Sequence, residues 1–390
     1  MIDRENTRRR VALFSPSLAG GGAERVLVNL ADGMLGEDID VDVVLASASG
    51  PFLSELPSGA RVVDLKASRI ATTVLPLARY LRNIRPDALL GFQDHTNVAA
   101  IAASVISRTQ TPVFAGVHTT WTTILQSQRL QNHLLARIVR IAYRHAAGIV
   151  SVSDGAADAV VHCLGVDRSH VRTIYNPVIG TDLFSKAEGA ISDPWFNVGQ
   201  PPVVLGIGRL TKLKQFDTLI ESFVRLRASC PARLLILGEG QERPALESLV
   251  KRLDLSEDVA LPGFVANPYP YMRRASVFVL SSAWEGLPTV LIEALALGAS
   301  IVSTDCPSGP SEILDNGRYG ALVPVGDAEA MAQAMHKAIT AKPIQRDPAS
   351  WARFTVSAAT AAYIETLLPS SSPRPSPKNA HGEYRSTIWN

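Results

Sequence analysis

Two cationic side chains, Arg209 and Lys214, lie in one short stretch, residues 206–216, between an expected strand and an expected helix. The planar guanidinium of arginine binds phosphate oxygens at two points, and lysine adds a compact charge. Each such hydrogen bond contributes about 1.5–3 kcal/mol and strengthens as a diphosphate gains charge. A surface turn that is basic by chance is the alternative, which the position at a strand end disfavours. The stretch therefore predicts a diphosphate site.

A second anion site is predicted in residues 281–298, where a strand ends, a loop turns and an apolar helix begins. Pro288 suits the first helical turn, where its missing N–H is not needed, and Gly298 suits the C-terminal cap. The free N–H groups of the helix start and the helix dipole favour an anion here. The residues predicted to line this site are Gly286, Leu287, Pro288 and Thr289.

Two glutamates accompany this helix start, with seven residues between them: Glu285 in the loop and Glu293 about one turn into the helix. An ionised Glu293 among apolar neighbours is costly unless it is hydrogen-bonded, and a ribose diol would satisfy it. Glu285 lies where it reaches the hydroxyls of a sugar beyond the diphosphate. The alternative is a solvated loop glutamate and a helix glutamate paired within the protein.

Three consecutive glycines, Gly20, Gly21 and Gly22, follow the first expected strand. Arg25 occupies the position where a dinucleotide-binding G-x-G-x-x-G motif has its third glycine, so a nicotinamide enzyme is disfavoured. Backbone without side chains can instead approach phosphates or an acceptor closely. An ordinary flexible turn is the alternative.

His118 follows the strand expected at 113–117 and lies at its rim, with Trp121 three residues later. The ring of Trp121 offers a surface on which an acceptor sugar can stack. A satisfied structural histidine is the alternative for His118.

One face of the helix expected at 129–147 is basic, because His133, Arg137, Arg140 and Arg144 recur at intervals of four, three and four residues. Such a stripe suits contact with anionic lipid or with a lipid diphosphate. An ordinary solvated helix face is the alternative.

Alternating strands and helices must position these residues. Strands are expected at 10–15, 41–46, 88–92, 113–117, 148–152 and 171–175, and again at 203–206, 233–237, 277–280, 300–303 and 321–323. Helices are expected up to residue 36, at 71–84, at 97–107, and from a cap at Asp154 to just before Gly165. This α/β alternation predicts parallel sheets covered on both faces.

Composition supports two globular domains. The chain has 390 residues, 46% hydrophobic and 19% charged, which is enough apolar material for two cores. The expected parts are domains at 1–185 and 203–350, a linker at 186–202, a final helix at 351–367 and a disordered tail at 368–390.

Charge and cysteine usage exclude several classes of protein. A net charge of +2 creates no bulk attraction to nucleic acid or to a membrane. Three widely spaced cysteines argue against a disulfide framework and a zinc cluster and fit a reducing, cytoplasmic setting. The sequence shows neither the apolar core of a signal peptide nor a run typical of a transmembrane helix.

Together these motifs resemble family 4 of the retaining glycosyltransferases, or glycosyl transferases group 1, which has the GT-B fold. The resemblance covers about residues 10–367. Besides the loop Gly20-Gly21-Gly22-Ala23-Glu24-Arg25, the two cations and the two glutamates, it rests on Ser151-Val152-Ser153-Asp154, Ile174-Tyr175-Asn176-Pro177, Pro262-Gly263-Phe264, Val323-Pro324-Val325-Gly326-Asp327 and residues 305–312. The last segment is similar to one common in members that build surface polysaccharides or lipid-linked oligosaccharides.

The resemblance implies two Rossmann-like domains that face each other across a cleft, the first binding the acceptor and the second the nucleotide sugar, with the last helix crossing back to the first. The residues that it implies for donor binding are Gly21, Gly22, Arg209, Lys214, Phe264, Val265, Glu285, Gly286, Leu287, Pro288, Thr289 and Glu293. Those implied for the reaction are His118, Glu285, Arg209 and Lys214, and Gly20 and Trp121 are expected to touch the acceptor.

The same resemblance implies individual roles. Arg209 and Lys214 would bind the diphosphate, Glu293 the ribose and Glu285 the transferred sugar. The loop after Phe264 would border the base, and the histidine would approach the donor sugar.

Members of the family retain the anomeric configuration, and no carboxylate pair is placed for a double displacement. The acceptor is therefore expected to attack from the face of the leaving group, whose phosphate oxygen takes the proton. The cations would replace a divalent ion, so neither a metal nor a cofactor is expected.

The expected reaction moves a hexose or N-acetylhexosamine from a UDP-sugar to a glycan or lipid-linked saccharide, in surface polysaccharide, lipopolysaccharide or glycoconjugate biosynthesis. Peripheral contact with the inner membrane surface is expected, and a nucleic acid partner is not. The alternatives are a sugar-nucleotide epimerase, a phosphorylase of the same architecture, or a non-catalytic carbohydrate-binding protein.

Overall fold

Two parallel sheets organise the chain, whose computed structural model describes residues 8–118, 130–341 and 347–369. The first sheet has seven strands in the order β3-β2-β1-β4-β5-β6-β7. Its strands are β1 (Arg10–Ser15), β2 (Asp40–Leu45), β3 (Arg61–Asp64), β4 (Ala88–Gly91), β5 (Val113–Val117), β6 (Gly148–Ser151) and β7 (Val171–Thr173). The order reverses at β1 and β4, and loops at the carboxyl ends of strands beside such a reversal are where α/β proteins bind ligands.

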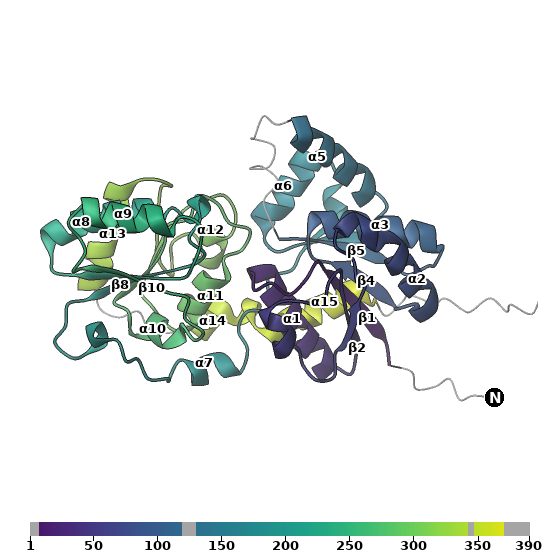
Figure 1. The fold of residues 1–390 in the computed structure, drawn as a ribbon, viewed down its shortest axis with the longest axis horizontal. Helices are drawn as coiled ribbons and strands as arrows, with labels where there is room; N and C mark the ends of the chain where they lie inside the picture. Colours follow the sequence, from purple (N-terminus) through teal and green to yellow (C-terminus); the bar gives the residue numbers. More distant parts are fainter. Residues whose placement is uncertain (1–7, 119–129, 342–346, 370–390) are drawn as a thin grey trace, which may run out of the picture.

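Helices cover both faces of this sheet, as the alternation predicts (Figure 1). They are α1 (Gly22–Gly36), α2 (Val74–Ile84), α3 (Asp94–Ser107), α5 (Leu130–Tyr143) and α6 (Asp154–Leu164). One core joins the sheet to α2, α3, α5 and α6, and the other joins it to α1. In the described part of the chain no helix is both long enough and apolar enough to span a membrane.

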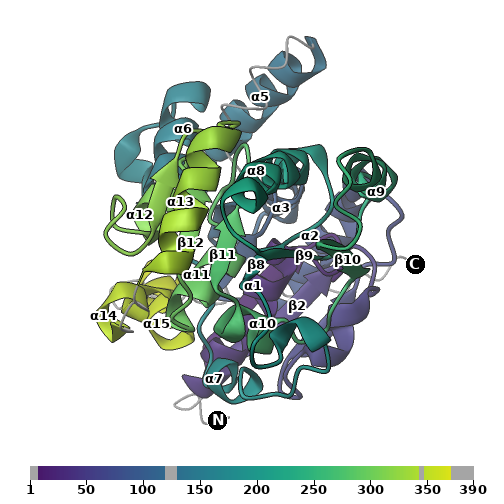
Figure 2. The same cartoon turned by 90° about the vertical axis from the view of Figure 1, so that its left-hand side faces the viewer.

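The second sheet has six strands in the order β10-β9-β8-β11-β12-β13, with a reversal at β8 and β11. Its strands are β8 (Val203–Ile207), β9 (Arg233–Leu237), β10 (Val259–Gly263), β11 (Val277–Leu280), β12 (Ile301–Thr304) and β13 (Ala321–Val323). Its helices are α8 (Phe216–Ser229), α9 (Arg243–Arg252), α10 (Tyr269–Arg274), α11 (Thr289–Ala296), α12 (Pro310–Ile313) and α13 (Ala328–Thr340). Figure 2 shows α8, α9 and α13 on one face of this sheet and α10 on the other.

The last described helix returns to the first sheet (Figure 1). The single helix predicted at 351–367 is wrong in detail, because the segment divides into α14 (Pro348–Trp351), a 3₁₀ turn at Ala352–Phe354 and α15 (Val356–Leu367). Thr355 is extended, and its hydroxyl caps α15 by accepting a hydrogen bond from Ala358 N at 3.2 Å. Tyr363 and Leu367 are buried in the core that contains α1. The predicted crossing back to the first domain is confirmed.

Other predicted bounds need correction. Several strands begin or end one or two residues from their expected positions, and β3 and β10 were not predicted. The 71–84 and 129–147 helices are shorter than expected, and the 97–107 helix begins earlier, at Asp94. Ser153, not Asp154, is the N-cap of α6. The short helix α7 (Asp182–Lys186) precedes the second sheet, and the tail from residue 370 lies outside the described residues.

Candidate functional site

Arg209, in the loop after β8, lies close to the glycine loop after β1. A Cβ atom on Gly21 would be 3.7 Å from Nη2 of Arg209, whereas one on Gly22 would have no neighbour within 4 Å. Arg209 is exposed and forms no ion pair with a described residue. Gly21 is the N-cap of α1 and provides no side-chain cap, so the helix start is suited to an anion. A cation of one domain and a helix start of the other thus border the same space.

Lys214 and Glu285 form an ion pair beside Arg209. Nζ of Lys214 is 2.5 Å from Oε1 of Glu285, and the two side chains are only 18% and 11% exposed. The Ser282 hydroxyl donates to the same carboxylate oxygen at 2.6 Å, and Ser281 donates to the Lys214 carbonyl at 2.7 Å. These bonds join the loops after β8 and β11. The residues predicted to bind the diphosphate and the sugar are therefore neighbours and neutralise each other in the unliganded protein.

The start of α11 lies next to this pair. Pro288 is its N-cap, one residue before the first helical turn where the sequence predicted it, and Thr289 is the first helical residue. Leu287 is 6% exposed and packs into the core of the second sheet, so its side chain anchors the loop. Gly298 has φ +75° just beyond the C-cap, a left-handed conformation that favours glycine.

Glu293, one turn into α11, is bonded by a residue that the sequence analysis missed. The Tyr269 hydroxyl donates to Oε1 of Glu293 at 3.3 Å. Burial raises the pKa of Glu293 to about 7, and the Tyr269 hydrogen bond and the charge of Arg25 oppose this rise only partly. The other carboxylate oxygen accepts no hydrogen bond from a described residue. That oxygen is available to a hydroxyl of a ligand.

His118 stacks on Phe92, with ring centroids 5.3 Å apart and an angle of 21° between the planes. Burial lowers the pKa of His118 to about 4, so its imidazole is neutral at physiological pH. It can therefore hydrogen-bond a sugar hydroxyl but does not bring a positive charge. Trp121 lies outside the described residues, and Gly20 adopts φ +95° beside Pro51.

Polar residues at the end of β4 and the start of α1 extend the site beyond the prediction. Gln93 donates from Nε2 to Oε1 of Glu24 at 3.4 Å. Oε2 of Glu24 lies so near Gly21 that a Cβ there would come within 2.4 Å of it. Gln93 follows a buried strand next to the reversal of the first sheet, which is the signal that could have identified it.

The remaining predicted features are Phe264 with Val265 and the basic face of α5. Phe264 is 77% exposed directly after β10, while Val265 packs against the core of the second sheet. On α5, Arg137 and Arg140 are exposed beside Ile138 and Ile141, which are 45% and 54% exposed. Arg144 follows the end of that helix, and the side chain of His133 is outside the described residues.

An open hollow of about 560 Å³ lies elsewhere, along the edge strand β3 and helix α2. Arg61, Lys66 and Tyr80 are among the residues that line it, and it contains none of the predicted site residues. It is therefore separate from the site at the two strand reversals.

Two family descriptions match successive parts of the chain: Glycosyltransferase Family 4 over residues 20–179 and Glycosyl transferases group 1 over residues 201–341. A Campylobacter jejuni protein, N-acetylgalactosamine-N,N'-diacetylbacillosaminyl-diphospho-undecaprenol 4-alpha-N-acetylgalactosaminyltransferase, is 28% identical over 335 residues, covering 84% of this chain and 89% of that protein. The lipopolysaccharide core biosynthesis glycosyltransferase LpsE of Rhizobium meliloti is 28% identical, covering 89% of this chain and 96% of its own.

Solved structures of other proteins share the fold. The crystal structure of Anabaena HepE in complex with UDP and glucose superposes with a TM-score of 0.70 at 20% identity, covering 92% of this chain and 96% of that one. Two parallel sheets, a returning last helix and family matches on both halves agree with one another. The chain therefore belongs to family 4 of the glycosyltransferases and has their GT-B fold.

Proposed function

We propose that this glycosyltransferase uses a UDP-sugar, transferring a hexose or N-acetylhexosamine with retention to a lipid-linked saccharide or glycan. The observation that carries the proposal is the exposed guanidinium of Arg209 at the start of α1, with Lys214 on the same loop paired to Glu285. A diphosphate would find cations of the second domain and a helix start of the first domain there. Support for UDP comes from Anabaena HepE, and support for a lipid-linked acceptor from the name of the Campylobacter jejuni relative.

In the proposed reaction, an acceptor hydroxyl oxygen bonds to C1 of the sugar on the face from which UDP departs. The bond from C1 to the phosphate oxygen breaks, and that phosphate takes the hydroxyl proton. Arg209 and Lys214 stabilise the charge that the diphosphate gains, in place of a divalent ion. Glu285, relieved of part of its pairing when the phosphate reaches Lys214, accepts hydrogen bonds from the sugar, and neutral His118 bonds another sugar hydroxyl.

Further contacts of the donor belong to the same proposal. The free oxygen of Glu293 accepts from the ribose, and Phe264 and Val265 border the base. Gly21 and Gly22 allow the diphosphate to approach the α1 backbone, and Gly20 and Trp121 touch the acceptor. We assign acceptor binding to residues 1–185 and donor binding to residues 203–350, joined by the linker 186–202.

A thermal-shift panel tests the choice of base. UDP, GDP and ADP are compared at equal concentration, since a ligand at 100 times its Kd adds about 2.7 kcal/mol to stability. UDP is expected to give the largest shift. A larger shift with GDP or ADP would reject UDP as the preferred nucleotide. Identification of the reaction product tests transfer itself, because an epimerised donor or a released sugar phosphate would reject it.

We also propose that the protein works at the cytoplasmic membrane surface, with the exposed face of α5 toward anionic lipid. Ile138 and Ile141 would enter the interface while Arg137, Arg140 and Arg144 meet phosphates. Flotation with vesicles of phosphatidylglycerol and phosphatidylcholine tests this. Binding that persists unchanged in Arg137→Glu/Arg140→Glu would contradict it.

A further inference from the structure

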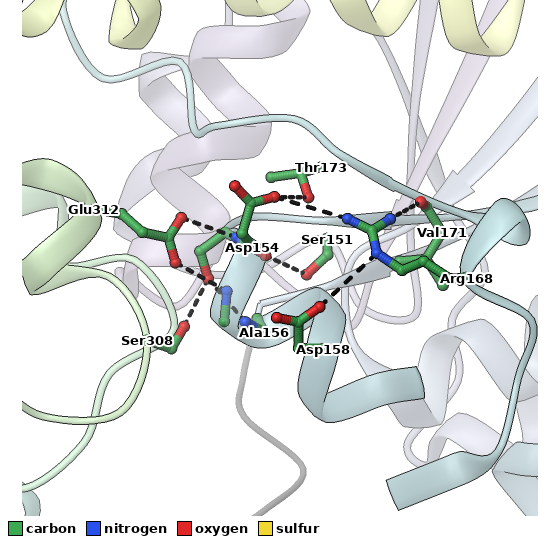
Figure 3. A network of polar contacts seen from close by, with 11 residues as sticks. Ser151, Asp154, Ala156, Asp158, Arg168, Val171, Thr173, Ser308 and Glu312 are labelled. Carbon is green, nitrogen blue, oxygen red and sulfur yellow. Dashed lines mark hydrogen bonds and ion pairs between the residues drawn. The ribbon is translucent and has the colours of Figure 1, made fainter. Parts of the chain in front are cut away.

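Polar contacts between the two domains gather at the start of α6 (Figure 3). The Glu312 carboxylate, from the second domain, accepts hydrogen bonds from the backbone N–H groups of Asp154 and Gly155, each at 2.9 Å. The Ser153 hydroxyl accepts from the N–H of Ala156 at 3.2 Å. The first three N–H groups of α6 are thus bonded, two of them by a residue of the other domain.

The loop that carries Glu285 also lies at the start of α6. The hydroxyls of Ser153 and Ser308 lie 2.9 Å and 2.8 Å from the carbonyl oxygen of Gly286 and 2.6 Å from each other. Two hydroxyl protons serve these three contacts, so the two serines and the carbonyl act as one unit. Gly286 follows Glu285 directly, so holding its carbonyl fixes the peptide next to that carboxylate.

The backbone around Ser308 is held tightly between the domains. Ser308 has φ +74° and Gly309 has φ +94°. A left-handed serine costs energy and persists only where its surroundings hold it. A Cβ on Gly155 of the first domain would lie 2.9 Å from Cα of Ser308, and one on Gly309 would lie 2.7 Å from Cδ of Pro288. The 308–309 segment is therefore a wedge between α6 and the loop before α11.

We propose that Ser153, Ser308 and Glu312 form an interdomain clamp that positions the Glu285–Gly286 loop against the first domain for sugar transfer. They are positioning residues: Ser153 and Ser308 act through the Gly286 carbonyl, and Glu312 acts through the backbone N–H groups at the start of α6. The inference rests on the proposed assignment of this loop to the donor. The clamp is expected to affect turnover more than UDP affinity, because neither Arg209 nor Lys214 contacts Ser153, Ser308 or Glu312 in the described part of the chain.

The experiment compares Ser153→Asp and Ser308→Ala, singly and together, with Ser311→Ala as the matched control, because the Ser311 side chain has no hydrogen bond among the described residues. Aspartate at 153 still caps α6 but has no proton for the Gly286 carbonyl. Ser308→Gly removes the hydroxyl and also relieves the backbone, which separates the two effects. Free UDP affinity is measured by calorimetry, and kcat and KM by UDP release from UDP-glucose and UDP-N-acetylgalactosamine.

The double variant is expected to lose about tenfold or more in kcat, with the Kd of free UDP changed less than about twofold, because one to two hydrogen bonds are removed. Each single variant should lose less than the double, since the remaining serine hydroxyl still donates to the Gly286 carbonyl. Ser308→Gly should behave like Ser308→Ala, and Ser311→Ala like the unaltered protein.

If the unaltered protein binds UDP and turns over donor, unchanged kcat in the double variant would reject the clamp but not the donor assignment. A fall in kcat accompanied by weaker UDP binding and a lower melting temperature would reject the clamp in the same way. Recovery of kcat in Ser308→Gly would show that backbone strain, not the hydroxyl, is the cause and would also reject it. An unaltered protein that binds no UDP would overturn the donor assignment, and the clamp with it.

Discussion

The Nη2 atom of Arg209 lies 3.7 Å from the position that a Cβ atom on Gly21 would occupy, although the two residues belong to different sheets. A side chain at position 21 would collide with the Glu24 carboxylate, since its Cβ would lie 2.4 Å from Oε2 of Glu24, whereas its distance from the guanidinium is an ordinary van der Waals contact. Glycine therefore suits this helix start, and Arg209 is a cation that the second domain brings to it.

Arg209→Ala is expected to lower kcat/KM by at least about tenfold, since each ~1.4 kcal/mol lost at the transition state is one decade. The melting temperature should stay within a degree or so, because Arg209 is exposed and pairs with no described residue. Lys212→Ala, which removes an exposed cation from the same loop, is the control and should leave both unchanged. Equal losses in the two variants would point to loop charge in general.

Lys214→Ala should differ from Arg209→Ala by also destabilising the protein, by about 1–2 kcal/mol, because it leaves the largely buried Glu285 without its cation. Lys214→Ala/Glu285→Gln is expected to restore much of the stability but none of the activity. Chemical denaturation and steady-state kinetics on the two variants separate these effects. A double variant no more stable than Lys214→Ala would contradict the pairing.

In the absence of a ligand, Glu293→Gln is expected to be more stable than the unaltered protein at high pH, and this difference should grow as the pH rises. Burial raises the pKa of Glu293 from about 4.5 to about 7, so folding takes up a proton between these values. Stability contributed by the protonated form is present below pH 4.5 and is lost as the pH rises through 7. The melting temperature of the variant should exceed that of the unaltered protein by more at pH 8 than at pH 5. The same difference at both pH values would reject the assigned pKa.

Binding of UDP should release a proton near pH 6.5. Ribose hydroxyls donate to the ionised Glu293 carboxylate, which lowers its pKa on binding. Calorimetry in two buffers of different ionisation enthalpy measures the release, and Glu293→Gln should abolish it. Proton uptake, or release that the variant retains, would exclude Glu293 as the ribose ligand.

Gly33→Ala should lower the free energy of unfolding by about 1–3 kcal/mol, because a new Cβ in α1 would meet Oγ1 of Thr360 in α15 at 2.1 Å. The matched control is Gly36→Ala in the same helix, where a Cβ meets no atom within 4 Å. That change should be neutral or stabilising by up to about 1 kcal/mol. Similar effects of the two substitutions would contradict the packing of the last helix on α1.

Sequence patterns predicted the buried parallel strands because these are apolar runs bounded by turns, as in Val113–Val117. They missed β3, whose edge position leaves its residues largely exposed, and β10, which contains Pro262. The break at Thr355 was invisible because apolar spacing continues on both sides, whereas the break depends on hydrogen bonds from Val178 and Ile179 to the Phe354 carbonyl.

For the site, residue types and strand ends indicated which side chains matter, but not which of them touch. Lys214 and Glu285 are 71 residues apart, and their pairing follows from the sheet order. Tyr269 and Gln93 lacked any motif and were found only from their bonds to Glu293 and Glu24. The site assignments themselves remain predictions that the variants above test.

The return of α15 to the first sheet means that the order of synthesis and the order of assembly differ. The strands of the first sheet are made before the second domain, yet their core includes Tyr363 and Leu367, which are made after it. Until those residues emerge, the side of α1 that packs against α15 stays uncovered, although α1 already packs on the first sheet. The second domain can complete its own core earlier, so the half that is translated first is the half that finishes folding last.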